Sequence, residues 1–102
     1  MPQNAQSKDA KAEPVINTTS LTAAVPAEEM PPFLQERIKR TPPTISVEDV
    51  RTLKPDEREQ VLAVVERALR YHLAAAQKYR NRGNPAELIA DGLKSFLYAA
   101  RE

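Results

Sequence analysis

The sequence predicts an all-α protein in which a disordered N-terminal arm precedes a short helix and an antiparallel two-helix hairpin. Seven of the nine prolines lie in the first 43 residues, whereas residues 55–102 repeat apolar residues at helical spacing, interrupted only at Gly83-Asn84-Pro85. Proline-rich sequence with few large apolar residues is typical of disorder, and the helical repeat is typical of amphipathic helices. We therefore expect residues 1–44 to be an arm and residues 45–102 to be a small three-helix domain.

Start and stop signals divide this domain into its helices. Ser46 is a typical N-cap residue, and Pro55 is suited to the first helical position of a second helix. Gly83 favours the left-handed conformation that ends a helix, and Asn84 is a typical cap for the next one. The predicted helices cover about residues 47–53, 55–82 and 85–100.

A separate segment of the arm, residues 31–43, lies between two proline pairs that leave room for about two helical turns. Leu34 and Ile38 are four residues apart and share a face of such a helix. Two interpretations stay open, because the apolar face either covers the core of the small domain or docks into a groove on a partner. The candidate partner-binding residues are Phe33, Leu34, Arg37 and Ile38.

The two long predicted helices differ in length, roughly 40 Å against roughly 24 Å at about 1.5 Å per residue. Folded back on the longer helix, the last helix reaches only to about Arg67, so the apolar stripe before Arg67 needs another cover. Part of this stripe can be covered by Ile45, Val47, Val50 and Leu53. We expect a second copy of the chain to cover the rest. The predicted oligomer interface consists of Val61, Leu62 and Val65.

Few residues are suited to catalysis or metal binding. The chain has no cysteine and a single histidine, His72, which lies on the apolar face of the long helix. A core or interface histidine that is hydrogen-bonded to a neighbour is the preferred interpretation. Only two glycines are present, so no glycine-rich phosphate loop is formed. The sequence therefore predicts no enzyme, no cofactor and no metal site.

A basic run follows the middle of the long helix, although the whole chain has a net charge of only +1. Basic side chains near a helix C-terminus complement the helix dipole. The same side chains are also suited to an acidic protein partner or to the phosphates of a nucleic acid. The basic residues are Arg67, Arg70, Lys78, Arg80 and Arg82, and Tyr71 is available to stack on a base.

These observations favour a small non-enzymatic protein-interaction module, such as a regulator, an adaptor or an assembly or secretion accessory factor. It is expected to bind a protein partner through the helical hairpin and the linear motif of the arm, and to form a homo-oligomer. One alternative is a nucleic-acid-associated regulator that uses the basic face, and a second is a structural subunit of a helical assembly. The sequence contains neither a Sec-type signal nor a membrane-spanning run, which predicts no membrane association and a cytoplasmic location.

Overall fold

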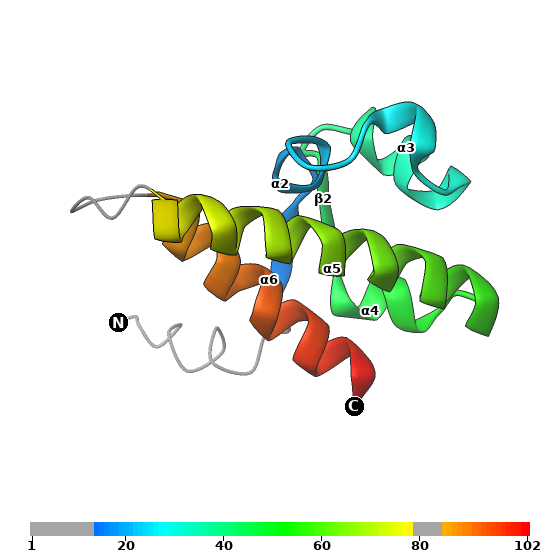
Figure 1. The fold of residues 1–102 in the computed structure, drawn as a ribbon. Helices are drawn as coiled ribbons and strands as arrows, with labels where there is room; N and C mark the ends of the chain where they lie inside the picture. The colour runs from blue at the N-terminus through cyan, green and yellow to red at the C-terminus, as the bar shows by residue number, and fades with distance from the viewer. Residues whose placement is uncertain (1–13, 79–84) are drawn as a thin grey trace, which may run out of the picture.

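The computed structural model describes residues 14–78 and 85–102, which form a mostly helical domain (Figure 1). The all-α prediction with a C-terminal hairpin is confirmed, because α5 and α6 lie side by side and run in opposite directions. A short two-stranded antiparallel sheet and shorter helices pack against this hairpin. The elements are β1 (Val15–Asn17), α2 (Thr19–Thr22), the 3₁₀ helix η1 (Ala27–Glu29), α3 (Pro32–Ile38), β2 (Thr44–Ser46), α4 (Val47–Arg51), α5 (Pro55–Lys78) and α6 (Pro85–Arg101).

The three predicted helix starts are confirmed. The Ser46 side chain accepts a hydrogen bond of 3.1 Å from the Asp49 backbone N–H, and the Asp49 carboxylate accepts one of 2.9 Å from the Ser46 N–H. This reciprocal pair satisfies two N–H groups that the first turn of α4 leaves open. The helices α5 and α6 begin at Pro55 and Pro85, where the missing N–H of proline costs no hydrogen bond.

The predicted helix ends differ more from the structure. The helix α4 ends at Arg51 rather than at residue 53, and α6 continues to Arg101. The predicted end of the long helix at residue 82 lies outside the described residues.

The prediction of a disordered arm reaching residue 44 is wrong from residue 14 onward. The strand β1 pairs with β2, with Ile16 opposite Ile45, and Leu21, Val25 and Met30 are buried in the core. These apolar residues are few, but the fold buries each of them. The average hydrophobicity of the segment does not reveal which residues will be buried. Residues 1–13, also part of the predicted arm, lie outside the described residues.

The predicted oligomer interface is also wrong, because the N-terminal segment helps to cover it within the chain. Val61, Leu62 and Val65 are buried within the chain, in one core with residues of α2, α3 and α4. Each of these three helices contacts α5, so the apolar stripe that needed a cover receives it from the same chain. A second copy of the protein is therefore not needed at these residues.

Candidate protein-interaction surface

The candidate docking motif lies in α3, and the structure shows the first of its two interpretations, the core cover. Leu34 is fully buried, and Phe33 and Ile38 are partly buried against the core. The Arg37 guanidinium lies 5.0 Å from the centre of the Phe33 ring and pairs with Asp49 of α4 at 3.1 Å. In this conformation the apolar face of α3 is used inside the chain, so the prediction of Leu34 as a partner contact is wrong.

The Asp49 carboxylate connects α3 with the start of α4. Partial burial acts to raise the pKa of Asp49, but hydrogen bonds from the backbone and side chain of Ser46 and the nearby Arg37 guanidinium outweigh it. The net effect lowers the pKa of Asp49 below its ordinary value, since each of these contacts favours the charged form. Asp49 therefore stabilises the fold as a carboxylate.

His72 is placed as the sequence suggested, in the core and hydrogen-bonded to a neighbour. It is only 6% exposed, and its Nε2 lies 2.9 Å from the backbone carbonyl oxygen of Ser20, just before Leu21 of α2. Because a carbonyl only accepts, Nε2 carries the proton and donates it to this hydrogen bond. The Tyr71 ring meets the imidazole edge to face, with 5.1 Å between the ring centres. His72 thus links α5 to the N-terminal segment.

The candidate basic face is only partly described. Arg80 and Arg82 lie outside the described residues. Arg67 is 3.8 Å from the Glu29 carboxylate of η1, so its charge is balanced within the chain. Tyr71 and Lys78 border a shallow depression of about 260 Å³ on α5. The described part of this face therefore offers less free positive charge than the sequence suggested.

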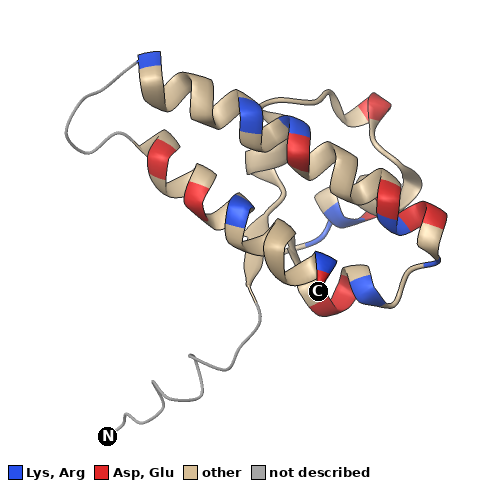
Figure 2. Ribbon diagram, turned by 60° about the horizontal axis from the view of Figure 1, so that its bottom comes forward, with Lys and Arg blue, Asp and Glu red and all other residues tan. Residues whose placement is uncertain are grey.

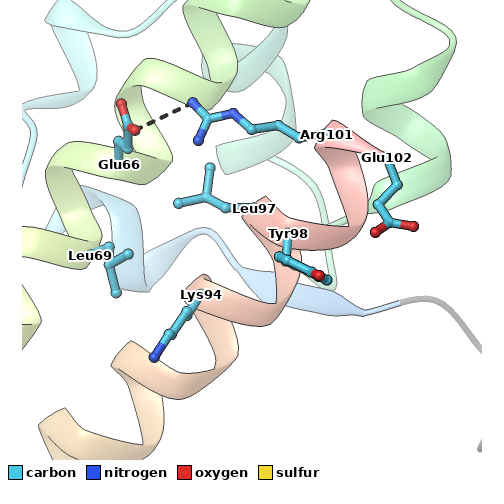
Figure 3. A pocket seen from close by; sticks show the side chains of 7 residues that line it. All are labelled: Glu66, Leu69, Lys94, Leu97, Tyr98, Arg101 and Glu102. Carbon is cyan, nitrogen blue, oxygen red and sulfur yellow. Dashed lines mark hydrogen bonds and ion pairs between the residues drawn. The ribbon is translucent and has the colours of Figure 1, made fainter.

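A larger groove lies between α5 and α6, and it brings together residues that the sequence did not assign to a common site (Figure 3). Its volume is about 660 Å³. Leu69 and Leu97 form its apolar floor, and the Tyr98 ring stands beside them (Figure 3). The complete lining consists of Glu66, Leu69, Lys94, Leu97, Tyr98, Arg101 and Glu102.

The rim of the groove carries charges of both signs. Arg101 of α6 donates a hydrogen bond of 3.3 Å to the Glu66 carboxylate of α5, which ties the two helices together at one end (Figure 3). Lys94 lies closer to the start of α6 and also lines the groove (Figure 3). A groove with an apolar floor, an aromatic side chain and a charged rim has the character of a protein-binding surface.

Tyr98 is one of several groove residues that the sequence analysis did not identify as a site. Its side chain is 74% exposed, although it follows directly after the buried residues Phe96 and Leu97. Leu73, one turn after Leu69 on α5, is 47% exposed and extends the apolar surface along that helix. The sequence signal that could have identified Tyr98 is an aromatic residue placed outside the apolar face of the last helix.

None of the helices in residues 14–78 and 85–102 combines the length and apolar character of a membrane span. In the same two ranges, no group of three or more His, Cys, Asp or Glu side chains is placed to hold a metal ion. The candidate surface is defined by the residues that line the α5–α6 groove. Comparisons with protein-family models, with curated proteins and with solved structures find no match to this chain.

Proposed function

We propose that this chain is a non-enzymatic protein-interaction module, a regulator or adaptor that acts in the cytoplasm and binds its partner in the groove between α5 and α6. The observation that carries the proposal is the 74% exposed Tyr98 ring beside the apolar floor formed by Leu69 and Leu97. Tyrosine and arginine are enriched among the residues that dominate binding energy at protein interfaces, and Arg101 lies on the same rim.

The groove suits a partner that presents an amphipathic helix. Its walls are two packed helices, so the surface is formed before binding and little ordering is needed. A partner helix would place an apolar side chain against Leu69 and Leu97, and Tyr98 would cover it. Lys94 makes no ion pair with any residue in the described ranges, so its side chain is available to contact the partner helix. This is the helix-in-groove mode of recognition.

The position of His72 supports a non-enzymatic role. It is the one histidine of the chain, and its Nε2 proton is used in the hydrogen bond to the Ser20 carbonyl. The buried imidazole is therefore not presented to a substrate in the groove. Among the described residues, the lining of the groove contains no serine, cysteine or histidine side chain.

The proposal is tested by selecting helical peptides from a displayed library on the wild-type chain and measuring their affinity for two variants. Tyr98→Ala removes the aromatic side chain from the groove. Leu88→Ala removes an equally exposed apolar side chain, 75% exposed on the same helix, that does not line the groove. Both variants should keep the wild-type melting temperature.

Peptides selected on the wild type should lose about tenfold or more in affinity for Tyr98→Ala, as expected of a residue central to an interface. Their affinity for Leu88→Ala should stay within about threefold of the wild-type value, because that change leaves the groove intact. A library that yields no groove-dependent binder, or binders that are equally tolerant of both changes, would count against the proposal.

A further inference from the structure

We infer that the occupant of the groove is a second copy of this chain, with the two α6 helices packed antiparallel about a twofold axis at the level of residue 96. This inference rests on the proposed function, because it names the partner of the same groove. The resulting dimer would place two hairpins face to face as four helices.

The order of charges along α6 carries the inference. Asp91 and Arg101 lie five residues before and five residues after residue 96, and Lys94 and Tyr98 lie two before and two after it. The acidic bands of α6 precede its basic bands (Figure 2). A twofold axis exchanges these positions, so Asp91 faces Arg101 of the partner subunit, and Lys94 faces Tyr98 of the partner subunit. Each contact occurs twice, as in any isologous interface.

The side chains concerned are available for these contacts. Asp91, Lys94, Tyr98 and Arg101 are all exposed in the single chain. Asp91 and Lys94 make no ion pair with residues in the described ranges. Arg101 already contacts Glu66, but its guanidinium has five donors and can serve a second carboxylate. Association therefore adds contacts without breaking those already formed.

The apolar residues and the charges would have different roles in this dimer. Burial of Tyr98, Leu73 and the floor of the groove would provide the driving force, since exposed ion pairs contribute little by themselves. The charged residues would set the register. With the axis at Lys94 instead, the two lysines would face each other and repel, which disfavours that register.

Other segments of the chain are less suited to fill the groove. Residues 1–13 contain no leucine, isoleucine, valine or aromatic residue that could fill an apolar floor. The exposed apolar side chains of Val15, Tyr71 and Leu88 do not line the groove. A second copy supplies complementary charges at the required spacing, because its Asp91 and Arg101 lie at equal distances from residue 96.

The inference is tested by sedimentation equilibrium of two charge-reversal variants of the full chain. Asp91→Arg gives a chain with arginine at both positions 91 and 101, and Arg101→Asp gives a chain with aspartate at both. Each variant alone should self-associate at least about tenfold more weakly than the wild type, because like charges then meet across the axis. An equimolar mixture restores both opposite-charge contacts and should dimerise within about threefold of the wild-type affinity.

Two further variants serve as controls. Glu28→Arg makes the same change in charge as Asp91→Arg at an exposed position in η1, and it should dimerise like the wild type. Glu66→Gln removes the carboxylate that Arg101 contacts within the chain. Its dimerisation constant therefore shows how much of the effect of Arg101→Asp comes from losing this contact within the chain. Melting curves of all variants show whether the fold is retained.

Three outcomes would overturn the inference. If the wild type stays monomeric at high micromolar concentration while helical peptides still bind in a Tyr98-dependent way, the dimer is wrong and the proposed function stands. If a dimer forms but neither reversal weakens it, the interface lies elsewhere on the molecule. If the wild type neither binds helical peptides nor dimerises, the inference and the proposed function are both contradicted.

Discussion

The Arg37 guanidinium donates a hydrogen bond to the Asp49 carboxylate across 3.1 Å, and this contact joins α3 to the first turn of α4. The same carboxylate accepts the Ser46 backbone N–H of the capping box. The Asp49 side chain therefore stabilises both the start of α4 and the contact between α4 and α3.

Because the pKa of Asp49 is lowered in the folded state, its contribution to stability depends on pH in a defined direction. The contribution is fully present above the unfolded-state pKa of about 3.9 and is lost as pH falls through the lower folded-state value. Asp49→Asn should lower the free energy of unfolding by about 1 kcal/mol at pH 7, because it removes the charge that favours the hydrogen bonds from Ser46 and Arg37. The difference from the wild type should shrink toward pH 3, where the wild-type carboxyl is protonated more often.

Urea titrations at several pH values measure this difference. Glu36→Gln, at an exposed position on α3, is the control, and its effect at neutral pH should stay within about 0.5 kcal/mol. A difference between the wild type and Asp49→Asn that is constant with pH would contradict the assigned role of the carboxylate.

The hydrogen bond from His72 to the Ser20 carbonyl provides a second prediction. His72→Leu keeps an apolar side chain in the core but leaves the carbonyl without its donor, which should cost about 1–3 kcal/mol of unfolding free energy. Arg70→Leu, at an exposed position on the same helix, should change stability by less than about 0.5 kcal/mol. Equal stabilities of the two variants in chemical denaturation would show that the His72 contact contributes nothing.

The N-terminal segment provides a third prediction, since Leu21 is fully buried with residues of α5. Leu21→Ala should lower the free energy of unfolding by about 2–5 kcal/mol, as do other core truncations that leave a cavity. Val15→Ala, in the exposed part of β1, should have little effect. Wild-type stability of Leu21→Ala would mean that this segment is an arm after all.

The hairpin could be predicted from the sequence because its signals are local. Ser46, Pro55 and Pro85 act on the residues next to them, and the structure places helix starts at these positions. The packing of residues 14–44 could not be predicted in this way. Ile16 and Leu21 are buried by contacts with residues far along the chain, and average hydrophobicity does not record such contacts.

The same missing contacts explain the errors at the candidate sites. With residues 14–44 expected to be an arm, part of the apolar stripe around Val61 and Val65 lacks a cover within the chain, so the sequence predicts a partner there. The structure instead leaves Leu73 and Tyr98 exposed, and Leu69 lines the groove between α5 and α6. The exposure of Tyr98 depends on how α6 packs against α5, which helical periodicity alone does not determine.

The binding groove and its occupant are tested most directly by an isotope-filtered NOE experiment on an equimolar mixture of labelled and unlabelled full chains. The filter selects contacts between chains, which separates them from the contact of Lys94 and Tyr98 one turn apart on the same helix. We predict cross-peaks between the side-chain methylenes of Lys94 in one chain and the ring protons of Tyr98 in the other. Cross-peaks that instead involve Tyr71 or Val15, or a spectrum without any contact between chains, would contradict the dimer formed through this groove.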